Sequence, residues 1–139
     1  MGVFQKSFRI STRGHGDVLD ITGQAARVVN ESRIRQGIVN ISGVGSTLGI
    51  TTLEFEPGCA ADLQRALEQI APSNGDYAHN ARWGDGNGYA HLRSALVGTT
   101  RSFPVMDGQV GTGTWQQIVL CDFDNRARDR QVLVTVIGE

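Results

Sequence analysis

Residues 115–137 read WQQIVLCDFDNRARDRQVLVTVI, and they determine the expected fold class. Two runs rich in apolar and β-branched residues, 115–123 and 131–137, predict strands, and Asp124 and Asn125 predict the turn between them. Strands that follow one another without a helical crossover favour antiparallel or mixed pairing, with helices on one face of the sheet. We therefore expect an α+β fold.

Other segments add strands and helices to this pattern. Further strands are predicted over residues 3–11, 18–21, 38–44, 48–55 and 102–105. Helical spacing of apolar residues predicts a first helix from Thr22, its N-cap, to Gly37, a second from Pro57 to Pro72, and a third over residues 89–96. Residues 73–88 form a polar, glycine-rich connection. We expect these elements to form one compact domain over residues 1–139, with a mostly antiparallel or mixed sheet packed against helices.

The composition excludes several classes of protein. A net charge of −1 gives no global basic field for nucleic acid, and the alternating Arg126, Arg128 and Arg130 are expected to form solvated surface. No window holds the roughly 18 consecutive apolar residues of a membrane helix. Two cysteines, Cys59 and Cys121, without an N-terminal signal peptide predict reduced thiols. We therefore expect a cytoplasmic protein with neither nucleic acid nor membrane as a partner.

Polar chemistry is concentrated in residues 77–94, which read YAHNARWGDGNGYAHLRS. Two of the three histidines, His79 and His91, lie in this segment. If Asp85 or Asn87 caps the third helix, Asn87 and His91 are four residues apart and share one face of its first turn. His79, arriving on a strand or loop, then converges with His91 and Asp85.

A metal site is one interpretation of this segment. The imidazoles of His79 and His91, with the Asp85 carboxylate or a water molecule, are ligands suited to a divalent ion such as zinc. The more ordinary alternative is that the histidines are partly buried hydrogen-bonding groups and that Asp85 is an N-cap. The spacing matches no zinc motif.

An anion site is the second interpretation, and it is compatible with the first. The turn at residues 84–88 offers backbone N–H groups, notably those of Gly86 and Gly88, at a helix N-terminus. Arg82 and Arg93 are placed to add bidentate hydrogen bonds to a phosphate or carboxylate. The alternative is a glycine-rich turn without a ligand.

Two further pairs of polar residues lie outside this segment. Glu54 and Glu56 are two apart on a predicted strand and face the same side, so either is a candidate base or ligand. An exposed pair is the alternative, which we favour for Glu56. Trp115 and Gln116 begin a predicted strand, where a tryptophan is more often part of a core or a subunit interface than a ligand platform. No serine lies in a nucleophile elbow, so a hydrolase triad has little support.

Several motifs occur in one order along nearly the whole chain. They are Asp20-Ile-Thr22, Gly45-Ser-Thr-Leu-Gly-Ile-Thr-Thr-Leu-Glu54, Tyr77-Ala-His-Asn80, Asp85-Gly-Asn87, His91-Leu-Arg-Ser-Ala-Leu-Val-Gly98, and Gly111-Thr-Gly-Thr-Trp-Gln116 with Arg128. Together they resemble the YjbQ-like family, whose assigned activity is that of a secondary thiamine-phosphate synthase. The resemblance implies a compact α+β fold that assembles as a homotrimer. Many members carry a histidine at the start of the central threonine motif, where this chain has Gly45; if that histidine is a metal ligand in those members, this chain has lost one ligand.

The resemblance and the pattern of residues 77–94 together give the set of expected site residues. Catalytic roles are expected for His79, Asp85, Asn87, His91 and Glu54. Substrate binding is expected for Arg82, Gly86, Gly88, Arg93, Ser94, Trp115 and Gln116. A divalent metal, zinc or magnesium, is expected on His79, His91 and Asp85, and no organic cofactor is expected.

The implied reaction joins a pyrimidine methyl pyrophosphate to a thiazole phosphate and releases pyrophosphate. It requires that the reactants be positioned and that the negative charge of the leaving group be stabilised. Small phosphorylated molecules are thus the expected ligands. One alternative is a non-catalytic trimeric module that binds a metal or a small anion. Another is a structural trimer with hydrogen-bonded histidines at its interface.

Overall fold

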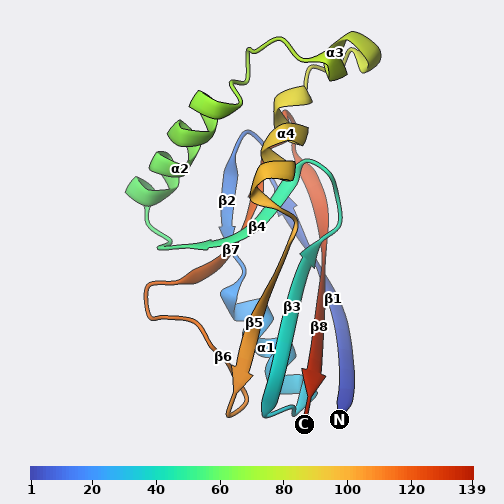
Figure 1. The fold of residues 1–139 in the computed structure, drawn as a ribbon, viewed down its shortest axis with the longest axis vertical. Coiled ribbons are helices and arrows are strands. Elements are labelled where there is room, and N and C mark those ends of the chain that lie inside the picture. Colours follow the sequence, from blue (N-terminus) through green and yellow to red (C-terminus); the bar gives the residue numbers. More distant parts are fainter.

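Eight strands and four helices form the fold, and the computed structural model describes every residue from 1 to 139 (Figure 1). The strands are β1 (Gly2–Thr12), β2 (Asp17–Asp20), β3 (Gln36–Gly43), β4 (Leu48–Leu53), β5 (Thr100–Met106), β6 (Gln109–Val110), β7 (Gln117–Asp122) and β8 (Arg128–Gly138). The helices are α1 (Thr22–Ser32), α2 (Pro57–Ile70), α3 (Ala78–Trp83) and α4 (Gly88–Val97). The two strands predicted within residues 115–137 are present as β7 and β8.

The strands form two sheets in which every pairing is antiparallel. The larger sheet has the order β1-β8-β3-β5-β6, and the smaller has the order β2-β7-β4. The predicted α+β class is confirmed, with antiparallel rather than mixed pairing. None of the four helices is both long enough and apolar enough to span a bilayer.

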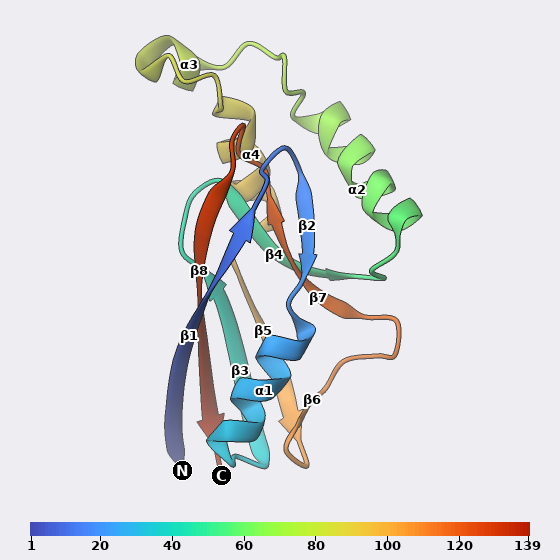
Figure 2. The same cartoon turned by 180° about the vertical axis from the view of Figure 1, so that it is seen from behind.

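The main core lies on one face of the five-stranded sheet, between this sheet and a layer formed by α1 and the small sheet (Figure 2). Because side chains alternate along a strand, Val132, Val134 and Val136 of β8 are buried, while Leu133 and Ile137 are exposed on the outer face. Each fully buried valine stabilises the fold by about 1.5–3 kcal/mol relative to an exposed one. This face therefore contributes much of the apolar stabilisation of the fold.

A second, smaller core lies on the opposite face of β7 and positions α4. Val119, Cys121 and Phe123 are buried there against Tyr89 and Ala90 of α4 and Leu67 of α2. The hydroxyl of Ser94 also donates a hydrogen bond of 2.5 Å to the carbonyl of Leu48 in β4. These contacts fix the first turns of α4, which carry His91.

The first helix differs from the prediction at both ends. Gly37 does not end it, because α1 stops at Ser32, Arg33 adopts the left-handed conformation with φ of 59°, and Gly37 pairs within β3. Thr22 is the first helical residue, and Ile21 is the N-cap. The Thr22 hydroxyl instead accepts a hydrogen bond from the backbone N–H of Ile118 in β7, so tertiary contact with the strand replaces capping.

The glycine-rich connection over residues 73–88 contains a helix that was not predicted. This helix, α3, has six residues and buries none of them, so it has no apolar stripe by which to recognise it. His79 accordingly lies on a helix rather than on a strand or loop. The prediction that Glu54 and Glu56 lie on a strand is also wrong, because β4 ends at Leu53 and Glu56 is the N-cap of α2.

Candidate functional site

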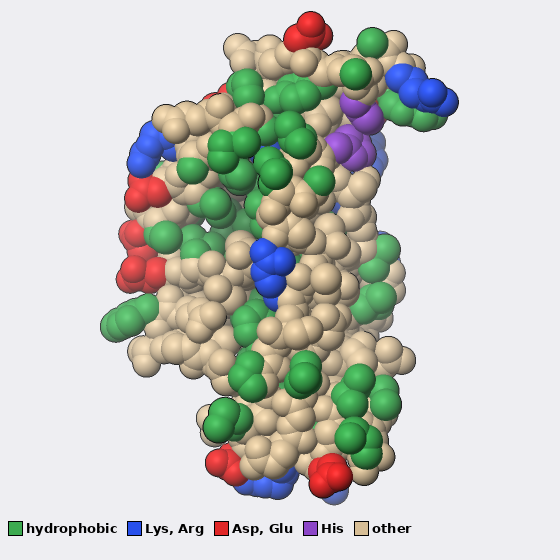
Figure 3. Space-filling model, in the orientation of Figure 1, with side chains coloured by type: hydrophobic (Ala, Val, Ile, Leu, Met, Phe, Trp, Pro, Cys, Tyr) green, Lys and Arg blue, Asp and Glu red, His purple; other side chains and the backbone are tan.

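The two histidines of residues 77–94 lie against each other, and we call them the histidine pair. The ring centroids of His79 on α3 and His91 on α4 are 4.4 Å apart, with the rings tilted by 38°. Nδ1 of His79 is 3.7 Å from Oδ1 of Asp85 and 3.4 Å from Oδ1 of Asn80. Figure 3 shows histidine side chains grouped on the surface next to α3 and α4. The expected convergence of His79, His91 and Asp85 is therefore present.

A close backbone contact brings α3 and α4 together. A Cβ atom at Gly88 would lie 2.7 Å from Cβ of Tyr77 and 2.9 Å from Oδ1 of Asn80, so only glycine allows this approach. The N–H of Gly88 donates to Oδ1 of Asn80 at 2.9 Å. Gly86 is exposed and has φ of 70°. Of the two amides expected to bind an anion, that of Gly88 is thus already used within the chain.

Asn87, the N-cap of α4, is buried and does not face solvent. Its Nδ2 donates to Oδ1 of Asp124 at 3.2 Å, while its Oδ1 is buried without a hydrogen-bond partner. Burial raises the pKa of Asp124, but hydrogen bonds from Asn87, the Asn125 amide, Arg128 and Thr47 outweigh it and hold the pKa below its usual range. Asn87 therefore acts on the carboxylate behind the site.

Asp124 belongs to a buried ion network formed by Asp122, Asp124, Arg128 and Arg130. Arg130 holds Asp122 through two hydrogen bonds of 2.7 and 2.8 Å, and Arg128 holds Asp124 at 2.9 and 2.7 Å. Thr47 connects the two halves, because it accepts from Arg130 at 2.7 Å and donates to Asp124 at 3.0 Å. The Arg130–Asp122 pair is bidentate, which is the stronger and more directional form of ion pair.

The prediction that the alternating arginines form solvated surface is wrong for Arg130, which is 7% exposed. Arg128 is half-buried and only Arg126 is exposed. The sequence does carry a signal for this arrangement. Arg130 is two residues before Val132 in β8, so both residues face the main core, where Arg130 meets Asp122 of β7.

A cleft of about 360 Å³ lies beside His91. We call it the Gly45 cleft. It is lined by Gly45 and Ser46 of the β3–β4 loop, by His91, Ser94 and Ala95 of α4, and by Gly98 and Thr99. A larger hollow of about 510 Å³ lies between Arg13–Val18 and the start of α2, and it is lined by His15 and by Glu56, whose carboxylate caps α2. The Gly45 cleft is the better candidate for chemistry because two of the predicted site residues, His91 and Ser94, line it.

Two further predicted substrate-binding residues, besides Gly88, are committed to internal contacts. Arg93 is buried, donates to the carbonyl of Ala71 at 2.9 Å and to Glu68 at 2.6 Å, and lies over the ring of Tyr89. Ser94 lines the Gly45 cleft, but its hydroxyl proton is donated to Leu48. Arg82 differs, because it is exposed and lies over its neighbour Trp83.

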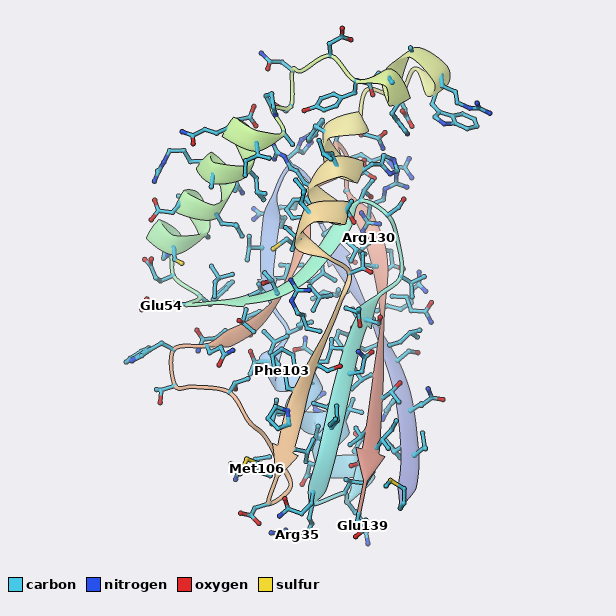
Figure 4. The ribbon with its side chains drawn as sticks, in the orientation of Figure 1. Arg35, Glu54, Phe103, Met106, Arg130 and Glu139 are labelled. Atoms are coloured by element: carbon cyan, nitrogen blue, oxygen red, sulfur yellow. The ribbon has the colours of Figure 1, made fainter.

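The remaining predicted residues lie apart from the histidine pair. Glu54 is exposed just beyond β4, and Figure 4 shows it on the other side of the molecule from Arg130. Trp115 is 72% exposed in the β6–β7 loop. Gln116 in the same loop accepts from the Gly113 N–H and donates to Thr52 at the end of β4. One chain therefore does not bring these three residues to the Gly45 cleft.

The chain does not offer a complete metal site. No group of three or more histidine, cysteine, aspartate or glutamate side chains is arranged to hold a metal ion. The rings of His79 and His91 face one another, and Nδ1 of His79 points to Asp85 and Asn80. Further ligands from outside this chain would be needed, so metal binding stays a prediction.

Comparison with known proteins gives one consistent result. Residues 6–139 match the profile of the family described as UPF0047 protein YjbQ-like. A UPF0047 protein of Methanothermobacter thermautotrophicus is 34% identical, over 100% of this chain and 95% of its own length. YugU of Bacillus subtilis is 30% identical over 96% of this chain and 98% of its own. The crystal structure of a protein of unknown function from Sulfolobus solfataricus superposes with a TM-score of 0.94 at 32% identity, over 99% of both chains.

Proposed function

The chain belongs to the UPF0047 YjbQ-like family, and from this premise we propose that it is a thiamine-phosphate-synthase-type enzyme that acts on small phosphorylated molecules. One structural observation supports a reactive site in particular. The histidine pair places His91 on the wall of a cleft whose other wall is the Gly45–Ser46 loop. A cleft with an imidazole on its wall and a buried arginine, Arg130, next to Gly45 is suited to a phosphorylated ligand.

The proposed reaction has a simple balance of atoms and electrons. The bond between the pyrimidine methyl carbon and the pyrophosphate oxygen breaks, and pyrophosphate leaves with the electron pair. The lone pair of the thiazole nitrogen forms the new carbon–nitrogen bond. The products are thiamine phosphate and pyrophosphate. The protein must hold the two reactants in line and stabilise the charge that develops on the leaving oxygen.

His91 is the residue we assign to the leaving group. It lies at the cleft, and an imidazole donates a hydrogen bond or a proton near neutral pH. His79 packs on its ring, and Asp85 lies 3.7 Å from Nδ1 of His79, so Asp85 orients His79 and His79 orients His91. Asn87 supports this arrangement indirectly, because its hydrogen bond to Asp124 fixes the start of the helix that carries His91. No step is assigned to a metal, because one chain lacks a converging set of ligands.

Assembly is part of the proposal. We propose a homotrimer, as the family resemblance implies. The outer face of the five-stranded sheet supports self-association, since Val3, Ile38, Met106, Leu133 and Ile137 are exposed hydrophobic residues of its strands. Analytical ultracentrifugation tests this directly, and a monomer at micromolar concentration would contradict it.

A non-catalytic binding module is the second candidate. Asn87, Gly88, Arg93 and Ser94 all use their polar groups inside the chain. That leaves His91 with few free polar neighbours in the cleft. In this case the cleft binds a small anion or, with further ligands, a metal ion, without turnover.

The deciding experiment measures pyrophosphate release from the pyrimidine pyrophosphate and the thiazole phosphate. We expect turnover by the wild type and a loss of roughly 100-fold in His91→Gln, which is the lower range for a general acid. Leu92→Gln is the matched control, because Leu92 is the exposed neighbour on the same helix. Retained ligand binding without turnover by the wild type would favour the module. The metal content of purified wild type and His91→Ala tests the metal prediction in parallel.

A further inference from the structure

Arg130 uses only part of its guanidinium group within the chain. Its Nε and Nη2 donate to the two carboxylate oxygens of Asp122, and Nη2 also donates to Thr47. Nη1 makes no hydrogen bond to the protein, although the side chain is only 8% exposed. The one buried side-chain polar atom without a partner is Oδ1 of Asn87, so Nη1 retains access to solvent. Nη1 is thus an unpartnered donor on a buried, rigidly held arginine.

Nη1 lies directly behind Gly45. A Cβ atom at Gly45 would be only 2.8 Å from Nη1 of Arg130. Figure 4 shows Arg130, from β8, next to the loop that joins β3 to β4. Gly45 and Ser46 of this loop line the cleft that His91 also lines. Because residue 45 has no side chain, the space next to Nη1 that a Cβ atom would occupy is unfilled, and it adjoins a residue that lines the cleft.

The charged groups around Nη1 balance one another, so Nη1 would attract an anion through directed hydrogen bonds rather than through a net positive charge. The ion network has two carboxylates, Asp122 and Asp124, and two guanidinium groups, Arg128 and Arg130, so its formal charge balances. Asp122 accepts from Nε and Nη2. The N–H groups of Nη1 therefore remain free to meet an anion on the opposite side. A guanidinium fixed in this way loses little conformational entropy when it binds a phosphate oxygen.

We infer that Nη1 of Arg130, together with His91, forms a subsite for a phosphoryl oxygen in the Gly45 cleft, and that the glycine at position 45 opens it. The inference deepens the proposed function and rests on it for the ligand class, a phosphorylated molecule. It makes Arg130, rather than Arg82 or Arg93, the arginine that recognises the phosphate. A larger residue at position 45 would cover the donor.

The test is calorimetric titration of the full chain with inorganic phosphate and with pyrophosphate. We expect Gly45→Ala to lose about tenfold or more in affinity, as expected when one charge-assisted hydrogen bond is lost. Gly108→Ala is the matched control. Gly108 also has a positive φ, of 78°, but it lies in the β5–β6 turn, and the nearest atom to an added Cβ would be 3.7 Å away. Both variants place alanine at a positive φ, which is 156° at Gly45, and only the variant at position 45 covers Arg130.

A second variant keeps the test independent of the backbone at position 45. Arg130→Lys retains a cation for Asp122 but removes Nη1, and we expect the same loss of affinity. Urea unfolding of each variant establishes that it is folded under the titration conditions. If Arg130→Lys does not fold, the comparison of Gly45→Ala with Gly108→Ala carries the result alone.

The outcomes separate this inference from the proposed function. Phosphate binding that is weakened only in Gly45→Ala and Arg130→Lys supports the subsite, even if no thiamine precursor is turned over. Unchanged phosphate affinity in folded Gly45→Ala overturns the subsite, even if the wild type is an active enzyme. Failure of the wild type to bind either phosphate or pyrophosphate at millimolar concentration also overturns it.

Discussion

Asn87 donates from Nδ2 to Oδ1 of Asp124 at 3.2 Å, which joins the start of α4 to the connection between β7 and β8. The segment that carries the histidine pair is thereby attached to the buried ion network. Asp124 in turn accepts from Arg128 and Thr47. The position of His91 therefore depends on charged groups distant from it in the sequence.

Replacing Asn87 by Ala is expected to destabilise the protein by about 1–3 kcal/mol at pH 7. The pKa of Asp124 is held below its usual range in the folded state, so its stabilisation is present above the unfolded pKa, about 3.9. It is lost as the pH falls through the lower, folded pKa. The difference between wild type and variant should therefore be smaller at pH 3 than at pH 7 in urea unfolding. Asn74→Ala, on the exposed connection, is the control, and a pH-independent difference would contradict the assignment.

Replacing Arg93 by Ala is expected to cost stability and not ligand affinity. Its loss leaves the carbonyl of Ala71 without its donor, which costs about 1–3 kcal/mol. Arg82→Ala, on exposed α3, should change stability by less than about 0.5 kcal/mol. Thermal unfolding and phosphate titration of both variants check this. A drop in phosphate affinity in a folded Arg93→Ala protein would restore Arg93 as a ligand residue.

Cys121 is expected to be inert towards thiol reagents in the native protein. It is fully buried, and burial together with the charge of Asp122 raises the pKa of its thiol to about 12. Cys59 is partly exposed. Titration with a chromogenic disulfide at pH 8 should therefore modify one thiol quickly and the second only on unfolding. The Cys59→Ser variant should show no fast phase, and a fast phase there would mean that β7 opens readily.

Removal of divalent metal is expected to leave phosphate affinity within about twofold, because the subsite recognises the anion through N–H donors of Arg130. Titrations with phosphate before and after treatment with a chelator provide the measurement. Loss of binding that returns on addition of zinc or magnesium would show instead that a metal recognises the phosphate.

The strand prediction succeeded where local pattern and long-range pairing agree. Residues 131–137 alternate in β8 as expected, since valines on one face gain from burial whichever strand lies beside them. The errors occurred where a local signal competed with a contact. Thr22 has the side chain of an N-cap but accepts from Ile118. Gly37 resembles a helix terminator but lies in β3, where an added Cβ would be 2.0 Å from the carbonyl oxygen of Ile137.

The convergence of His79, His91 and Asp85 was expected from the sequence because all three lie within thirteen positions of one another, so short connections limit how far apart they can be. The pairing of Arg130 with Asp122 is also partly indicated by the sequence, because each residue lies on the same strand face as its buried apolar neighbours. By contrast, no local pattern places Glu54, Trp115 or Gln116 relative to the histidine pair. Within one chain they lie elsewhere.

The amino-acid sequence alone was sufficient for the fold class, for most strands and for the choice of residues 77–94, because alternation, turn residues and clustering are local properties. It was not sufficient to tell which polar groups remain free. Asn87, Arg93 and Ser94 were candidates by residue type, yet each is committed to a partner between 22 and 46 positions away. Arg130 became a candidate only through the space left by Gly45, 85 positions earlier in the chain. Burial and hydrogen-bond satisfaction depend on what folding brings alongside a side chain, and that information is not local.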